Sequence, residues 1–199
     1  MNLELFRQTL NRAVLDKLPE LTWISQLEGM GSPWTQHVLN VSCWCLKQTK
    51  EAYVEVGAWH GASFDAASKN CDDVNKVVCE RGVYEDLRTL VKATPNTTLV
   101  EGDFFESELP IPMGSVGAFY YDGYHSLAAT VWSFDKIKPY LADRAILLMD
   151  DLCYDSVFKG WRIIGMKEGV TIVHEFWPAQ MCDEKNWWNG FGIAEFTRS

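Results

Sequence analysis

Three aspartates and one histidine have the residue types and the spacing of a reactive site. Asp122 and His125 follow one short apolar run, and the adjacent pair Asp150 and Asp151 follows the next run. If the two runs are neighbouring parallel strands, their carboxyl ends meet at one edge of a sheet. Carboxylates this close repel one another unless protons or a cation intervene, and oxygen ligands suit Mg²⁺ or a similar divalent ion. The group predicts metal-assisted acid–base chemistry, with His125 exchanging a proton near neutral pH.

The same four residues also have an ordinary structural interpretation. Aspartate is common in turns and at helix N-termini, which would account for Asp122 and for the pair Asp150 and Asp151. His125 could equally cap a helix or lie on the surface. Carboxylates that lie together would favour the reactive site, and scattered carboxylates would exclude it.

A glycine loop forms the second candidate site. Glu55, Gly57 and Gly61 follow an apolar run in the spacing E-x-G-x-x-x-G and precede a helix-like segment. Glycine is needed where a strand-to-helix loop turns sharply or approaches a ligand, and the free N–H groups of the helix favour an anion. A dinucleotide site usually reads G-x-G-x-x-G, whereas Trp59 stands here at the position of the middle glycine. The spacing predicts a nucleotide-cofactor cradle, although any tight strand-to-helix turn favours glycine.

Two acidic residues follow the next two apolar runs. Glu80 comes about twenty residues after the glycines, where an acidic side chain can accept both hydroxyls of a ribose. Asp103 follows Gly102 at the end of the third run, and Gly-Asp is also an ordinary turn dipeptide. Together with the glycine loop, these residues place acids at the ends of three successive strands.

Short apolar runs alternate with helix-like segments from Ala52 onward, which is typical of βαβ units. The alternation predicts an α/β fold with a doubly wound sheet, helices on both faces and ligands at the carboxyl ends of the strands. The last two runs are expected to pair as a hairpin, so that the last strand of a seven-stranded sheet is antiparallel. The runs are Tyr53–Val56, Val77–Cys79, Thr98–Val100, Val116–Tyr121, Ala145–Met149, Val170–His174 and Gly192–Phe196.

Helices are predicted before and between these runs. Apolar residues recur at helical spacing from Leu3 to Leu18, and Pro19 ends the pattern. Ser32 as N-cap and Pro33 at the first helical position predict the start of a second helix. The further predicted helices are Ala62–Lys69, Tyr84–Lys92, Ser126–Lys138 and Ser156–Lys167.

The composition limits the classes of partner. The chain has 199 residues, 47% of them hydrophobic, and a formal net charge of −9. This charge argues against nucleic-acid binding, which relies on clustered lysine and arginine. No apolar run approaches the roughly 20 residues needed to span a bilayer, and the N-terminus lacks the pattern of a secretory signal. We expect a cytoplasmic protein whose partners are small molecules, and the sequence does not indicate its oligomeric state.

The six cysteines contain no C-x-x-C pair, which argues against a disulfide framework and a tetrahedral zinc site. Most are expected to be reduced residues of the core.

The glycine loop and the aspartates resemble those of class I S-adenosylmethionine (SAM)-dependent methyltransferases, whose Rossmann-like sheet the strand pattern also fits. The E-x-G-x-x-x-G segment is similar to their first motif. Asp122, His125 and the pair Asp150-Asp151 resemble the catechol-type, metal-dependent O-methyltransferases, which carry an Asp after strand four, an Asp-Asn pair after strand five and a base three residues after the first Asp. Here Asp151 replaces the Asn and His125 replaces a Lys, so the extra negative charge could strengthen metal binding or change the preferred metal.

The Asp-Gly-x-His-Ser segment and the Asp-Asp pair are also similar to a broader group of bacterial class I methyltransferases, which includes enzymes that act on sugars and natural products. The resemblance covers roughly Ala52–Leu152 and is strong at the level of motifs.

The resemblance implies roles for these residues. Ser63 would help to hold the carboxylate of the methionine part of SAM, Glu55 would lie near its ammonium group, and Asp103 would accept a hydrogen bond from the adenine amino group. The implied metal ligands are Asp122, Asp150 and Asp151, and the implied catalytic residues are His125 and Asp122. The implied cofactor-binding residues are Glu55, Gly57, Gly61, Ser63, Glu80 and Asp103.

We expect one domain over residues 1–199: an N-terminal helical cap (1–50), a cofactor-binding core (52–151) and a C-terminal part with an acceptor-side loop (152–199). Trp187 and Trp188 in this loop could form an apolar wall for the acceptor. The expected function is SAM-dependent O-methylation of a small hydroxylated acceptor, such as a sugar, a phenol or a natural product, with assistance from Mg²⁺. The alternatives are a metal-independent methyltransferase, a NAD-dependent oxidoreductase, which Trp59 disfavours, and a non-catalytic SAM-binding module.

Overall fold

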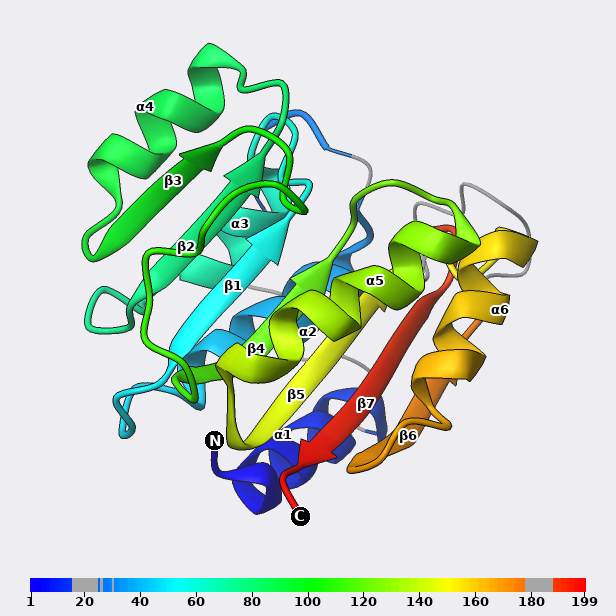
Figure 1. Ribbon diagram of the computed structural model, residues 1–199. Helices are drawn as coiled ribbons and strands as arrows, with labels where there is room; N and C mark the ends of the chain where they lie inside the picture. Colours follow the sequence, from blue (N-terminus) through cyan, green and yellow to red (C-terminus); the bar gives the residue numbers. More distant parts are fainter. Residues whose placement is uncertain (16–24, 26, 30, 178–187) are drawn as a thin grey trace.

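The described residues form a mixed sheet of seven strands in the order β3-β2-β1-β4-β5-β7-β6 (Figure 1). The computed structural model describes residues 1–15, 25, 27–29, 31–177 and 188–199. Neighbouring strands from β3 to β5 are parallel, whereas β7 is antiparallel to both β5 and β6. The strands are β1 (Ala52–Val56), β2 (Lys76–Glu80), β3 (Thr97–Glu101), β4 (Val116–Tyr121), β5 (Leu141–Asp150), β6 (Val170–Phe176) and β7 (Phe191–Thr197). This confirms the predicted α/β sheet with an antiparallel last strand.

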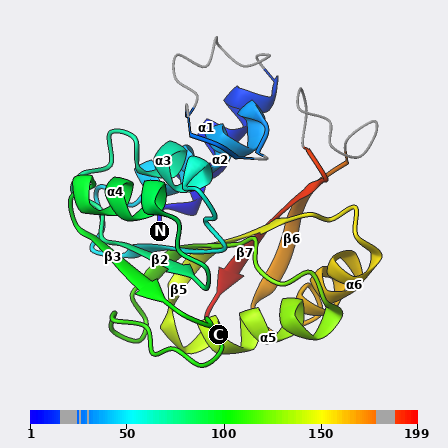
Figure 2. The ribbon, with the colours of Figure 1, turned by 90° about the horizontal axis from the view of Figure 1, so that it is seen from above.

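Helices cover both faces of the sheet (Figure 2). Helices α1 to α4 lie on one side of it, and α5 and α6 lie on the other. The helices are α1 (Leu3–Leu15), α2 (Pro33–Trp44), α3 (Ala62–Ser68), α4 (Glu85–Ala93), α5 (Leu127–Ile137) and α6 (Asp155–Ile164), with a short 3-10 turn, η1 (Lys138–Tyr140), after α5. Among the described residues, none of the helices combines the length and the apolar character needed to cross a membrane.

Serine side chains cap the starts of α2 and α5. The Ser32 hydroxyl accepts a hydrogen bond from the Thr35 N–H, and Pro33 occupies the first helical position of α2. The Ser126 hydroxyl accepts a hydrogen bond from the Ala129 N–H at the start of α5. Both helix starts are as the sequence predicted, because each cap satisfies an N–H that has no partner within its helix.

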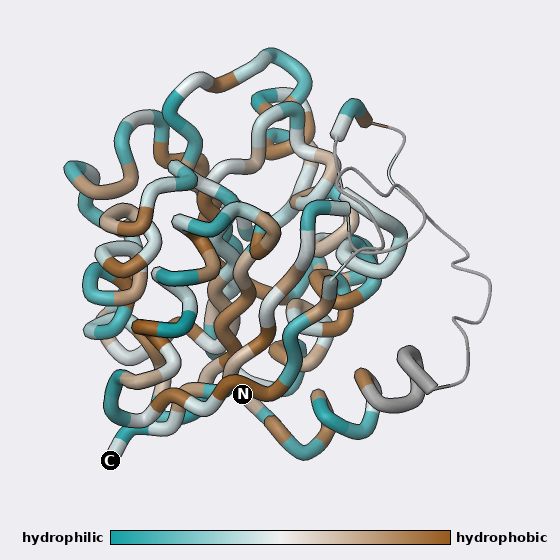
Figure 3. Tube along the Cα trace, turned by 90° about the vertical axis from the view of Figure 1, so that its right-hand side faces the viewer, coloured by the Kyte–Doolittle hydropathy of each residue, from teal (hydrophilic) through white to brown (hydrophobic). Residues whose placement is uncertain are grey.

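The hydrophobic core has two parts, one on each face of the sheet. Side chains alternate along each strand, so Tyr120 and Leu148 pack towards α1 and α2, whereas Tyr121 and Met149 pack towards α5 and α6. Apolar residues therefore follow one another along the central strands (Figure 3). A sheet buried on both faces in this way requires nearly continuous apolar runs, which is why the strands could be recognised in the sequence.

The N-terminal helix is fastened to the sheet by an ion pair. Arg7 of α1 donates two hydrogen bonds to the carboxylate of Glu195 on β7, and this carboxylate is buried. The pairing supplies the partner that a buried charge needs. The expected end of the first helix at Pro19 and most of the loop 178–189, including Trp187, lie outside the described residues.

The described cysteines are free thiols, as expected for reduced core residues. Cys43, Cys45, Cys71 and Cys79 are buried and Cys153 is partly buried. Cys182 lies outside the described residues.

Candidate active site

Two cavities meet at the carboxyl ends of β1 and β4. The first, about 320 Å³, is lined on one side by α2 and on another by the ends of β4 and β5. The second, about 700 Å³, is lined by the ends of β2 and β3 and by the first turns of α5. Both cavities are lined by Gly57, Trp59, Asp122 and Gly123. We name the first the α2 cavity and the second the α5 cavity. Because the two are adjacent and share lining residues, a single elongated ligand could occupy both.

The glycine loop passes directly beside the end of β4. Gly57 has φ +88°, and a Cβ built on it would overlap the main-chain carbonyl oxygen of Asp122. The strand register explains the contact. Val56 pairs with Tyr121, so the residues that follow them, Gly57 and Asp122, also lie side by side. Gly61 also has a positive φ, +100°. Only glycine fits at Gly57 without moving the main chain, so the first glycine of the motif is required by the fold as well as by any ligand.

Glu55 is a fully buried carboxylate behind the loop. It accepts hydrogen bonds from the hydroxyls of Tyr53, at 2.8 Å, and Ser63. Burial raises the Glu55 pKa to about 7, and the two hydroxyl donors only partly oppose that shift. The Ser63 hydroxyl therefore donates its proton to Glu55, while Ser63 itself lines the α2 cavity.

The raised pKa of Glu55 predicts a pH dependence of stability. The folded protein holds this proton more tightly than the unfolded chain, so the stabilisation is full below about pH 4.5 and is lost as the pH rises through about 7. A pKa raised from 4.5 to about 7 corresponds to about 3 kcal/mol of unfolding free energy. Glu55→Gln is expected to flatten the fall in stability over this range, measured by urea unfolding at several pH values. Glu108→Gln, at an exposed position, is the control and should follow the unaltered protein.

Glu80, the last residue of β2, and Asp103, which follows β3, both line the α5 cavity. The carboxylate of Glu80 accepts hydrogen bonds from the backbone N–H groups of Trp59, at 2.8 Å, and Gly82, at 3.0 Å. Asp103 accepts one from the Phe105 N–H at 2.8 Å. Glu80 thus holds Trp59 in its left-handed conformation, φ 49°. The sequence did not indicate this second role of Glu80.

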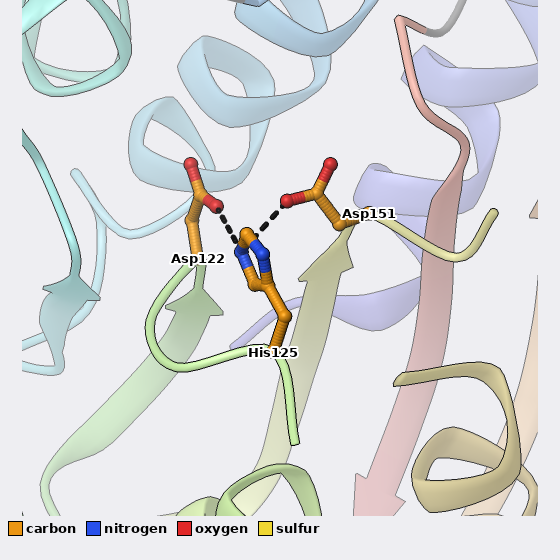
Figure 4. A group of neighbouring side chains, drawn as sticks. All are labelled: Asp122, His125 and Asp151. Carbon is orange, nitrogen blue, oxygen red and sulfur yellow. Dashed lines mark ion pairs between the residues drawn. The ribbon is translucent and has the colours of Figure 1, made fainter. Parts of the chain in front are cut away.

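The reactive group predicted from the sequence is brought together at the ends of β4 and β5 (Figure 4). His125 lies on the loop after β4, and its Nε2 atom is 2.7 Å from Asp151 Oδ2 and 3.6 Å from Asp122 Oδ1. One donor atom from each of these three residues lies within 4.8 Å of the others. Asp150 lines the same α2 cavity. The carboxylates therefore lie together, which favours the reactive site over scattered turn and cap residues.

Charge coupling dominates this cluster. Hydrogen bonds from His125 to Asp122 and Asp151 raise the pKa of the imidazole to about 10, against the opposing effect of burial. Burial raises the pKa of Asp122 to about 6, and burial together with the neighbouring carboxylates raises the pKa of Asp150 well above its usual range. At neutral pH His125 is a cation that offsets the negative charge of Asp122 and Asp151.

Two residues that the sequence did not single out complete the cluster. The Tyr120 hydroxyl donates to Asp150 Oδ2 at 2.6 Å and lies 3.4 Å from Asp122 Oδ2, so it separates two carboxylates that would otherwise repel. Tyr154 stacks on the His125 ring with centroids 5.2 Å apart. The position of Tyr120 carries a signal, because residues two apart on a strand share a face and Asp122 follows it by two.

The donor set tests whether a cation could be held. Two carboxylates and an imidazole converge, with Asp150 in the same cavity. Carboxylates fit Mg²⁺ and Mn²⁺, whereas imidazole is more often a ligand of transition metals. The ligand atoms of these residues are suitable for a divalent ion. The protonated imidazole of His125 also places a positive charge between the same carboxylates.

A family of known domains matches the centre of the chain. Residues 54–152 match the family described as a methyltransferase domain. The match runs from β1 through the end of β5 and includes both the glycine loop and the aspartate cluster. No curated protein matches the sequence significantly.

Solved structures share the fold at low sequence identity. A putative caffeoyl-CoA O-methyltransferase from Staphylococcus aureus is 13% identical with a TM-score of 0.62, covering 98% of this chain and 92% of its own. A precorrin-6y C5,15-methyltransferase from Geobacter metallireducens is 16% identical with a TM-score of 0.59, covering 81% and 87%. The SAH-bound methyltransferase PaMTH1 of Podospora anserina is 12% identical with a TM-score of 0.58, covering 81% and 79%.

Proposed function

This chain belongs to the class I SAM-dependent methyltransferases, and from that premise we propose that it methylates an oxygen atom of a small hydroxylated acceptor. The observation that carries the proposal is a shared cavity. The α2 cavity is lined both by the glycine loop, through Gly57 and Ser63, and by Asp122, Asp150 and Asp151. A methyl donor bound by the glycine loop and an acceptor oxygen bound by the aspartates would therefore lie in the same cavity. The oxygen specificity is also suggested by the name of the Staphylococcus aureus neighbour.

We assign the two cavities to the two ends of the cofactor. In the α5 cavity, Glu80 would accept the ribose hydroxyls and Asp103 would accept a hydrogen bond from the adenine amino group. Ser63, which lines the α2 cavity, would turn its proton towards the cofactor carboxylate, and Glu55, buried behind the loop, would lie near the ammonium group. Burial raises the pKa of Glu55, and an ammonium group beside it would supply a cation that favours its ionised form.

SAM, when bound, supplies an electrophilic methyl group on a sulfonium. The residues of the chain must hold the acceptor oxygen in line with that group and take its proton. We propose that the hydrogen-bonded group of Asp122, His125 and Asp151 takes the proton. The Asp122 pKa, raised by burial to about 6, lies close to the working range of a general base. Because His125 already carries a proton at neutral pH, it does not act alone as a neutral base. It acts together with the two carboxylates to which it is hydrogen-bonded.

We propose that a divalent cation joins Asp122, Asp150 and Asp151 during catalysis. It would favour the ionised acceptor hydroxyl and fix two adjacent oxygens. His125 would then lose its proton or its ion pairs, because the metal ion would bind the carboxylates of Asp122 and Asp151 that now pair with the imidazole. The specific alternative is catalysis without metal, which the existing His125 ion pairs favour.

Removal of metal is expected to separate these two mechanisms. EDTA should lower the rate of methyl transfer at least 100-fold, and added Mg²⁺ or Mn²⁺ should restore it, because several kcal/mol of charge stabilisation would be lost. The rate is measured by mass spectrometry of the methylated product, using vicinal diols as acceptors. SAM binding in EDTA, measured by calorimetry, is the control and should not change. A full rate in EDTA would support catalysis without metal, with His125 as the side-chain cation beside the carboxylates.

A further inference from the structure

Two side chains at the start of α6 contact His125 from the side away from β4. The Ser156 hydroxyl donates a hydrogen bond to the main-chain carbonyl oxygen of His125 at 2.6 Å. The Tyr154 ring stacks on the imidazole at an angle of 21°. One contact therefore holds the main chain of His125, and the other holds its ring. Ser156 itself lines neither the α2 cavity nor the α5 cavity.

The packing of α6 against α5 explains why Ser156 reaches this loop. A Cβ built on Gly160 of α6 would lie only 2.6 Å from the Cβ atom of Thr130 on α5. The two helices lie on the same face of the sheet (Figure 2), and each follows one of the parallel strands β4 and β5. They therefore run in the same direction, so the residues one turn earlier on each helix also lie side by side. This places Ser156 beside the residues that precede α5, and its hydrogen bond joins two packed helices.

The start of α6 also holds Asp151, the closest partner of the imidazole. The Tyr154 N–H donates a hydrogen bond to the main-chain carbonyl oxygen of Asp151 at 3.0 Å. One short segment thus contacts both members of the pair in which His125 Nε2 lies 2.7 Å from Asp151 Oδ2. The His125 side chain is 41% exposed, so burial alone does not confine the ring. The contacts from α6 supply part of that confinement.

We propose that Ser156 is a positioning residue of the reaction, because it holds the loop of His125 so that the imidazole stays at Asp151. The inference rests on the proposed function, which gives His125 a part in methyl transfer. Reacting groups must be held closely in the productive geometry, and a displacement of about 1 Å can cost about 10²-fold in rate. Loss of the Ser156 hydroxyl removes none of the reacting groups, but it frees the loop that carries the ring.

Steady-state kinetics of two variants test the role of the hydroxyl. With SAM and 3,4-dihydroxybenzyl alcohol as substrates, Ser156→Ala is expected to lower kcat at least tenfold. The KM for the alcohol and the Kd for SAM should stay within twofold, because the walls of both cavities are unchanged. Ser156→Thr keeps a hydroxyl and should restore kcat to within threefold of the unaltered protein. A purely structural role of Ser156 would not produce this split between kcat and KM.

Ser115→Ala is the matched control. The Ser115 hydroxyl also donates to a main-chain carbonyl oxygen, that of Pro112, at the same distance of 2.6 Å. Ser115 precedes β4 and therefore lies at the opposite end of that strand from His125. Its replacement should leave kcat and KM unchanged. Equal losses of kcat in Ser115→Ala and Ser156→Ala would contradict a specific role of Ser156.

Crystal structures supply a readout that does not depend on activity. In Ser156→Ala the distance between His125 Nε2 and Asp151 Oδ2 is expected to exceed about 3.5 Å, beyond hydrogen-bonding range, whereas Ser156→Thr should keep it. An unchanged distance in Ser156→Ala would overturn the inference. If the distance increases but the unaltered protein methylates no diol, the positioning of the imidazole stands and the proposed reaction is wrong. If the protein methylates the alcohol and Ser156→Ala keeps its full kcat, the reaction stands and the role of Ser156 is wrong.

Discussion

Replacement of His125 by alanine is expected to reduce the rate of methyl transfer about 10²- to 10⁴-fold, the usual range for loss of a positioned acid–base group. The ring lies between Asp122 and Asp151, so its removal takes away a proton site and leaves two carboxylates facing each other without their cation. Asp150→Ala should cause a loss of similar size, because Asp150 receives the Tyr120 hydroxyl and belongs to the same cluster. Both rates are measured at saturating SAM.

The affinity for SAM distinguishes a catalytic effect from a folding effect. Calorimetry should give both variants a Kd for SAM close to that of the unaltered protein, because the glycine loop and Glu55 remain in place. His174→Ala is the matched control, since His174 lies on β6 and lines neither the α2 nor the α5 cavity. Full activity in His125→Ala and in Asp150→Ala would show that the cluster does not take part in the reaction.

The substitution Gly57→Ala is expected to give the largest loss of stability of any change in the loop. The new Cβ would overlap the Asp122 carbonyl oxygen, and the residue would have to keep φ +88°. Strain of this kind costs on the order of 1–3 kcal/mol, and the overlap with main-chain atoms adds to it. We expect a loss of about 3 kcal/mol or more in the free energy of unfolding, measured by urea denaturation, and at least tenfold weaker SAM binding.

Gly114 provides a matched control for the backbone conformation. It also has a positive φ, +71°, but no atom lies within 4 Å of a Cβ built there. Gly114→Ala should therefore cost about 1–2 kcal/mol, the price of the left-handed conformation alone. Equal losses at the two positions would mean that the contact between Gly57 and Asp122 relaxes easily, and that the close approach does not constrain the site.

The sheet and the cluster could be predicted because two kinds of local signal agreed. Runs buried on both faces are nearly continuous in apolar residues, and the strand predictions fell within a few residues of the observed bounds. For β5 the prediction began at Ala145, whereas the strand begins at Leu141. Asp143 and Arg144 are exposed and interrupted the apolar pattern that defined the run. The carboxyl-end rule for parallel strands then placed Asp122 near Asp150 and Asp151 without knowledge of the register.

What could not be predicted depends on contacts between distant segments. The hydrogen bond from the Trp59 N–H to Glu80 and the stacking of Tyr154 on His125 join segments 21 and 29 residues apart. No periodic pattern reports such contacts. The charge of His125 is also a tertiary property, because its pKa depends on hydrogen bonds to Asp122 and Asp151. The sequence indicated a histidine that exchanges a proton. The fold places this histidine in a hydrogen-bonded group with Asp122 and Asp151.

The contact between Gly57 and Asp122 has a consequence for how this protein could diversify. It fixes the loop that would hold the donor against the turn that carries Asp122 and His125, so neither segment can shift without the other. Other walls of the α2 cavity lie outside this contact, among them Gly31 and Gln36 at α2 and Tyr154 before α6. Evolution could therefore exchange one acceptor for another by changing those walls, while the reacting centre is inherited as a single rigid unit.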